Sequence, residues 1–134
     1  MATVYINLPV ADLAKATAFY EAIDFVKNPQ FSDAKASGMG YDNSLFVMLL
    51  THEFTKWFIG NKTIADSHAT CEVLNAVQLD SKEAVDALFA KAIWAWGKAL
   101  NSYDHGFMYG KDFEDLDGHI RELFWMDASQ MPQQ

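Results

Sequence analysis

The stretch NLPVADLAKATAFYEAIDF, residues 7–25, decides the fold. Apolar residues alternate with other residues from Val4 to Val10, as in a half-buried β-strand. Asp12 then fits a helix N-cap, because its carboxylate can accept hydrogen bonds from backbone N–H groups of the first turn. A helix follows, and its apolar stripe consists of Leu13, Ala16, Phe19, Tyr20 and Ile23.

The same pattern recurs 69 residues later, at about half the chain length. The corresponding residues of the second copy are Val77, Leu79, Ser81, Val85, Leu88, Phe89 and Ala92. Short strands are expected after each helix, at 45–50 in the first half and at 98–103, 106–113 and 119–126 in the second. We therefore expect an α+β fold of two βαβββ modules with a curved mixed sheet. One domain would hold module 1 (about 1–51), a linker (about 52–69), module 2 (about 70–127) and a tail (128–134).

Composition excludes several classes of partner. The chain has 134 residues and a net charge of -8, so we expect no binding to nucleic acid or to an anionic membrane. The single cysteine excludes a disulfide framework and a thiolate zinc site. The first residues enter a strand without a basic segment, and no apolar run is long enough for a membrane helix. A reducing cytoplasm is the expected location.

The stretch 7–25, the stretch DHGFMYGKDFEDLDGHIREL (104–123) and the repeat together resemble the vicinal oxygen chelate superfamily. That superfamily includes glyoxalase I, bleomycin-resistance proteins and extradiol dioxygenases, and this chain is most similar to an uncharacterised glyoxalase-like branch. The resemblance covers nearly the whole chain. It implies that the two modules enclose a cavity and that four strands carry metal ligands. Carried over to this sequence, the four positions are Tyr5, Val47 or Leu49, Leu74 and Glu122.

Only Glu122 among these residues is of a type that binds metal. A divalent ion needs several His, Gln or carboxylate ligands at once. The residues therefore predict no functional metal and no cofactor. A metal-dependent lyase or isomerase of the same superfamily is the alternative hypothesis, and whether the protein is an enzyme stays open.

The family register and strand alternation place Ile120, Glu122 and Phe124 on the cavity face. The same count places Tyr5, Asn7, Val47, Leu49, Glu72, Leu74, Ala76 and Gln78 there. Such a surface favours a small apolar or amphipathic molecule bound between the modules. We predict ligand contacts from Tyr5, Asn7, Leu49, Leu74, Gln78 and Phe124. Glu122 is the candidate catalytic residue, since burial would raise its pKa and allow it to act as a general base or as a hydrogen-bond donor. Otherwise Glu122 is only a carboxylate satisfied by Tyr5 or Asn7.

Trp94 and Trp96 are a second candidate feature. Trp94 falls opposite the apolar stripe of the second helix, and a tryptophan centred on a solvent face is unusual. Related sequences tend to have Gly-Gly after this helix, whereas here Gly97 alone is left for a left-handed C-cap. Arg121 replaces a common aromatic residue of the family. These departures indicate a partner surface, such as a homodimer contact, or deliberate redesign of a natural scaffold.

Overall fold

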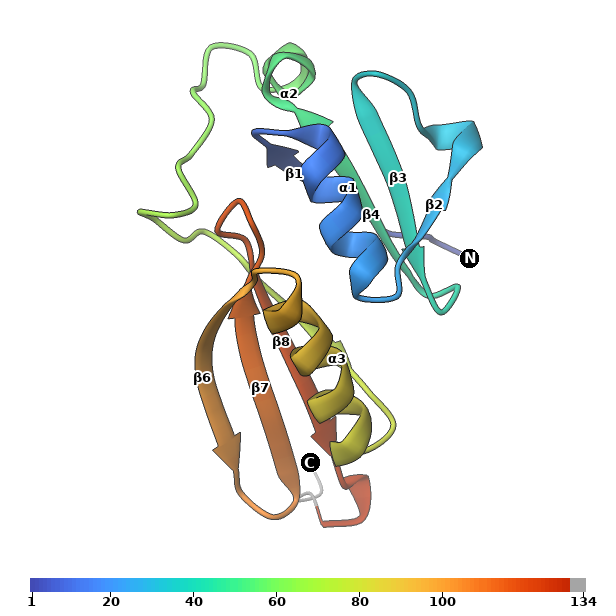
Figure 1. Ribbon diagram of the computed structural model, residues 1–134, viewed down its shortest axis with the longest axis vertical. Helices are drawn as coiled ribbons and strands as arrows, with labels where there is room; N and C mark the ends of the chain where they lie inside the picture. Colours follow the sequence, from blue (N-terminus) through green and yellow to red (C-terminus); the bar gives the residue numbers. More distant parts are fainter. Residues whose placement is uncertain (131–134) are drawn as a thin grey trace. The chain divides into compact units, whose positions relative to one another are not determined.

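The computed structural model describes residues 1–130. The chain divides into two compact units, Met1–Thr70 (unit 1) and Cys71–Gln134 (unit 2). Of the expected tail 128–134, residues 131–134 lie outside the described residues. Unit 1 contains β1 (Tyr5–Val10), α1 (Leu13–Ala22), β2 (Val26–Asn28), η1 (Pro29–Phe31), β3 (Ala36–Tyr41), β4 (Leu45–Thr51) and α2 (His52–Phe58) (Figure 1). Unit 2 contains β5 (Leu74–Gln78), α3 (Lys82–Trp94), β6 (Lys98–Asp104), β7 (Met108–Glu114), β8 (Ile120–Met126) and η2 (Ala128–Gln130).

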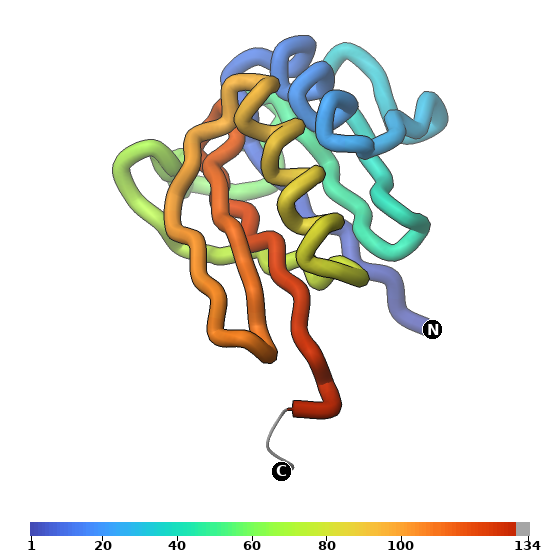
Figure 2. The backbone as a smooth tube through the Cα atoms, turned by 60° about the horizontal axis from the view of Figure 1, so that its bottom comes forward, coloured from blue at the N-terminus to red at the C-terminus, as the bar shows by residue number. Residues whose placement is uncertain are grey.

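Each unit has one four-stranded mixed sheet. The strand orders are β1-β4-β3-β2 and β5-β8-β7-β6, so the two sheets have the same topology. The pairs β1–β4 and β5–β8 are parallel, and the other pairs are antiparallel. The predicted α+β class and the two βαβββ modules are therefore confirmed. The chain path in Figure 2 shows how each long helix follows the first strand of its unit.

Side chains cap both long helices as the sequence predicts. The Lys15 backbone N–H donates to the Asp12 carboxylate at 3.0 Å. The Ala84 backbone N–H donates to the Ser81 hydroxyl, also at 3.0 Å. Such a cap typically stabilises a helix by ~1 kcal/mol, because it satisfies a backbone donor that has no partner within the helix.

Each helix buries its apolar stripe against one face of its own sheet. In unit 1, α1 contacts β3 and β4, and the buried residues include Ala16, Phe19, Tyr20, Ile23, Leu8, Met39, Val47 and Leu49. A hydrogen bond of 2.8 Å joins the buried hydroxyls of Thr17 on α1 and Ser37 on β3. In unit 2, α3 contacts β7 and β8, and the buried residues include Val85, Leu88, Ala92, Phe113 and Leu123. Full burial of each large side chain stabilises a fold by roughly 1.5–3 kcal/mol.

The C-terminus of α3 differs from the sequence prediction. The left-handed residue is Trp96, with φ of +79°, and not Gly97. The Gly97 N–H donates to the Ala92 carbonyl at 2.8 Å, and the Trp96 N–H donates to the Ile93 carbonyl at 3.1 Å. These two bonds form a Schellman motif with a tryptophan at the position that glycine usually occupies. Gly97 is needed for another reason, since a Cβ atom there would lie 2.8 Å from the Ala92 carbonyl oxygen.

The turn DLDG (115–118) sets the start of β8. The Asp115 carboxylate accepts hydrogen bonds from the backbone N–H groups of Asp117 and His119, each at 2.9 Å. Gly118 adopts φ of +85°, which glycine allows at no steric cost. The Asp115 carboxylate therefore has a structural role, and the first carboxylate of the strand itself is Glu122.

Candidate functional site

Each sheet has one face covered by its helix and a second face, the open face, on the other side. Residues paired across neighbouring strands point to the same side of a sheet, so the register decides which side chains share the open face. In unit 1, Tyr5 is paired with Phe46 and Asn7 with Met48, and these four residues lie on the open face. The predicted positions of Tyr5 and Asn7 agree with this register.

The predicted positions of Val47 and Leu49 are wrong. Both residues are 0% exposed, and they pair with Ile6 and Leu8 on the helix-covered face. The predicted alternation of this strand was shifted by one residue, and such a shift assigns every side chain to the wrong face of the sheet. Leu49 is thus a core residue and cannot contact a ligand on the open face. Phe46 and Met48 lie on the open face in its place.

A groove of about 590 Å³ lies on the open face of unit 1. Its lining includes Tyr5, Phe31, Gly38, Gly40, Phe46 and Met48. The rings of Tyr5 and Phe46 are stacked, with centroids 5.2 Å apart and planes at 28°. The Phe31 ring meets the Tyr5 ring edge-on, with centroids 6.5 Å apart. The groove therefore has an aromatic wall, and its volume is within the ~300–1,000 Å³ usual for small-molecule sites.

Two glycines of β3 shape this groove. A Cβ atom on Gly38 would lie 2.8 Å from the Phe31 Cβ atom, so glycine is required for η1 to approach β3 this closely. A Cβ atom on Gly40 would meet only the Phe46 ring, at an ordinary contact distance of 3.7 Å. The space above Gly40 is consequently open, and a side chain there would fill part of the groove.

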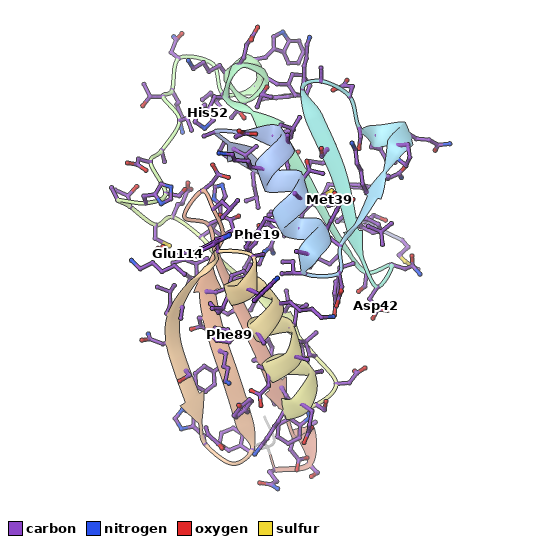
Figure 3. The ribbon with its side chains drawn as sticks, viewed as in Figure 1. Phe19, Met39, Asp42, His52, Phe89 and Glu114 are labelled. Carbon is purple, nitrogen blue, oxygen red and sulfur yellow. The ribbon has the colours of Figure 1, made fainter. Side chains whose placement is uncertain are left out.

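Polar groups also line the groove, namely Lys27, Asn28, Asp42 and Asn43. Figure 3 shows Met39 on β3 and Asp42 at the turn between β3 and β4. Asp42 and Asn43 have φ of +51° and +54°, so two consecutive residues of the short turn between β3 and β4 adopt a left-handed backbone. This tight turn holds two polar side chains at one end of an otherwise apolar groove.

Glu122 lies at the centre of the open face of unit 2. It is paired with Ala76 on β5 and with Asp112 on β7. Leu74, Gln78 and Phe124 share this face, because Leu74 is paired with Ile120 and Gln78 with Phe124. The sequence prediction placed Glu122, Leu74, Gln78 and Phe124 on one face, and the register agrees. Tyr5 and Asn7 belong to the other unit, and a ligand position between the modules stays a prediction.

Two residues beside Glu122 were missed by sequence reasoning. Burial, and secondarily the charge of Glu122, raises the pKa of the Asp112 carboxyl. Burial, and then the charges of Asp112 and Glu122, raises the pKa of the Tyr103 phenol, which packs over Gly110. Two carboxyl groups and one phenol therefore gather on this face. The alternation of β7 and its hairpin pairing with β8 were the signal that could have revealed Asp112.

Three residues of unit 2 depart from related sequences, and they differ in how far they are exposed. Trp94 and Trp96 are each 87% exposed, as a partner surface requires. Arg121 is 2% exposed and lies on the helix-covered face with Leu123 and Phe113. Arg121 is therefore a core residue and cannot belong to an exposed partner surface.

The side chains present do not fit a divalent metal ion. The resemblance implies Tyr5 and Val47 or Leu49 in unit 1, and Leu74 and Glu122 in unit 2, and only Glu122 among these is of a metal-binding type. Phe46 and Met48, which replace Val47 and Leu49 on the open face, offer no oxygen or nitrogen ligand from their side chains. Among residues 1–130, no group of three or more His, Cys, Asp or Glu side chains could hold a metal. Neither is any helix of this range long and apolar enough to cross a membrane.

Comparison with known proteins identifies the fold. No family model and no curated protein sequence matches this chain. Among solved structures, a hypothetical protein from S. aureus superposes with a TM-score of 0.78 at 27% identity, covering 93% of this chain and 94% of that one. A glyoxalase/bleomycin resistance protein/dioxygenase family enzyme from Burkholderia phytofirmans gives a TM-score of 0.73 at 20% identity, covering 91% and 96%. The chain has the fold of the vicinal oxygen chelate superfamily.

The glyoxalase-like fold is shared with fosfomycin resistance proteins. FosX from Listeria monocytogenes superposes with a TM-score of 0.69 at 22% identity, over 96% of each chain. Another structure of that FosX contains Mn(II) and a sulfate ion. The resemblance read from the sequence is thus confirmed at the level of the fold. The donor set described above differs from what such an ion requires, so no step proposed below uses a metal.

Proposed function

We propose that this glyoxalase-like protein binds a small, largely apolar molecule with a flat ring in the groove of unit 1. The aromatic wall formed by Tyr5, Phe31 and Phe46 is the observation that carries the proposal. A flat ring can stack on these side chains, and each aromatic pair contributes ~0.5–1.5 kcal/mol beyond the burial of its area. The polar side chains of Asn7 on the open face and of Asn28 and Asp42 in the lining would orient an amphipathic ligand.

Recognition in this groove needs no ion, because stacking and burial supply the affinity. Met48 adds a polarizable thioether to the lining, which suits contact with ring edges. The open space above Gly40 leaves room for the ligand within the sheet face. These features support a binding protein whose specificity depends on ring shape and on hydrogen bonds from a few polar groups.

Glu122 is the residue that we propose for proton transfer if the protein turns its ligand over. The raised pKa of Asp112 favours the protonated form of that carboxyl, so the pair can hold one acid and one base side by side. In this arrangement Glu122 accepts a proton and Asp112 donates a hydrogen bond. Gln78 and Phe124 are proposed as ligand contacts on the same face, with Leu74 beside them.

A matched pair of phenylalanines tests the binding proposal. Phe31 is 52% exposed and Phe58 is 58% exposed, both are in unit 1, and Phe31 lines the groove. A panel of flat aromatic probes, including indole and an anilinonaphthalene sulfonate, is titrated by calorimetry. Phe31→Ala should weaken binding by about three- to tenfold, whereas Phe58→Ala should not change it. Equal losses in both variants would contradict the proposal.

Gly40→Leu and Glu122→Gln separate binding from turnover. Gly40→Leu fills the groove without a backbone collision, so it should abolish probe binding and leave the unfolding temperature nearly unchanged. Glu122→Gln should leave probe binding in unit 1 unchanged. If a substrate is found, Glu122→Gln should remove its turnover, and an unchanged rate would exclude Glu122 as the base.

A further inference from the structure

Charge is distributed unevenly around the groove of unit 1. Within residues 1–130, the charged residues of its lining are Lys27 and Asp42. The register places the Lys27 side chain on the helix-covered face, because Lys27 is paired with Met39 and Met39 with Val47, and both of these partners are buried in the core. The Asp42 carboxylate is therefore the charged group left to the groove. No cationic side chain of the described residues forms an ion pair with it.

Asp42 lies close to the aromatic wall of the groove. Tyr5, Phe46 and Gly40 form one row across the sheet, because Tyr5 is paired with Phe46 and Phe46 with Gly40. Asp42 follows Gly40 by two residues, a span of at most ~7 Å along the chain. The carboxylate thus stands near one end of the row that carries the stacked rings.

The aromatic wall itself favours a positive charge. The faces of aromatic rings carry negative partial charge and attract cations. The Tyr5 and Phe46 rings are stacked at 5.2 Å, and the Phe31 ring meets Tyr5 at 69°. A delocalised cation is more weakly hydrated than a compact ammonium group, so it loses less hydration when it packs against such a wall. A ring that carries the charge itself therefore suits this surface better than an alkylammonium ion does.

The charge of the whole chain acts in the same direction. A net charge of -8 attracts cations and repels anions, over a distance that the salt concentration sets. A neutral ring would gain the stacking but neither this attraction nor the interaction with Asp42. An anionic ring would be repelled by both.

We infer that the groove of unit 1 prefers a flat heteroaromatic cation, with the positive charge delocalised over the ring, to a neutral or anionic ring of the same shape. The ring stacks on the wall formed by Tyr5 and Phe46, and its charged end lies toward Asp42. This inference rests on the proposed function, because it names the class of molecule that the groove binds. Asp42 is then the residue that determines specificity for charge.

Three probes with one ring system and different charges test the inference. They are N-methylacridinium, which is a cation, acridine, which is neutral at pH 8, and an acridine carboxylate, which is an anion. Each probe is titrated into the full chain by calorimetry. N-methylacridinium should bind about tenfold tighter than acridine, and the carboxylate should bind more weakly than both. Added salt should weaken binding of the cation and leave that of acridine unchanged.

Two variants that each remove one negative charge locate the effect. Asp42→Asn should weaken binding of N-methylacridinium about two- to fivefold and leave acridine binding unchanged. Asparagine tolerates the left-handed backbone at this turn, so the variant keeps the fold. Glu21→Gln is the matched control, because it removes the same charge from an exposed position of α1, and it should change neither affinity.

The outcomes separate this inference from the proposed function. If acridine binds as tightly as N-methylacridinium and Phe31→Ala weakens both, the proposed function stands and the inference is overturned. Equal losses in Asp42→Asn and Glu21→Gln would also overturn it, since the preference would then come from the net charge alone. If none of the three probes binds, the inference and the proposed function both fail.

Discussion

Trp96→Gly should stabilise the fold. The left-handed backbone at Trp96 costs ~1–2 kcal/mol, and glycine removes this cost. Glycine gives back ~0.5–1 kcal/mol, because it loses more conformational freedom on folding. Little burial is lost, since the side chain is 87% exposed. The expected net gain is roughly 0.5–1 kcal/mol, or a rise in Tm of about 2–5 °C for a domain of this size.

The assay is urea unfolding of Trp96→Gly and Trp96→Ala beside the wild type. Trp96→Ala removes the same ring but keeps the Cβ atom, so it should unfold like its parent. If Trp96→Gly is no more stable than Trp96→Ala, the backbone at this position is not strained and the reasoning is refuted.

Three further stability predictions follow from the same unit. Gly97→Ala should destabilise the fold by about 1–3 kcal/mol in urea unfolding, since the new Cβ atom would lie 2.8 Å from the Ala92 carbonyl oxygen; an unchanged midpoint would contradict the close contact. Lys111 donates a hydrogen bond of 2.8 Å to the Asp86 carboxylate, and Tyr109 donates another. These bonds, that of Lys111 first, hold the pKa of Asp86 below its usual range. The ionised carboxylate therefore stabilises the fold at pH values above the pKa near 3.8 of the unfolded chain. The difference between wild type and Asp86→Asn should therefore vanish as the pH falls below the lowered pKa, and a constant difference would contradict the ion pair. Burial, and then the charge of Glu122, raises the pKa of Asp112, so the ionisation of this carboxyl opposes folding as the pH rises above 3.8. Asp112→Asn should therefore increase the free energy of unfolding at pH 7 and have no effect in strong acid. A variant that is less stable than the wild type at pH 7 would contradict this prediction.

The fold was predictable because local and repeated signals agree. Alternation, the Asp12 and Ser81 caps and the two helical stripes each require only neighbouring residues, and the recurrence after 69 residues gives the topology. The face of β4 was not predictable in the same way. The strand LFVMLL (45–50) has apolar residues on both faces, so alternation does not show which of its side chains face the helix. Only the pairing of Tyr5 with Phe46 shows this.

The candidate site was predictable only in part, for related reasons. Glu122 and its neighbours on β5 follow from simple alternation. Phe31 could not be placed, because η1 returns over the sheet only where Gly38 allows a close approach. Trp96 could not be placed either, because the Schellman motif ends the helix before it and leaves its side chain exposed. Both residues lie where the chain leaves regular structure.

Mapping bound probes by NMR tests the central claim most directly. The full chain, labelled with ¹⁵N, is titrated with the panel of flat aromatic probes, and changes in backbone amide shifts are followed. The account predicts saturable changes confined to the groove, at Gly38, Gly40, Phe46 and Met48, and their disappearance in Gly40→Leu. Changes at Trp94 and Trp96 alone, or no saturable change with any probe of the panel, would contradict it.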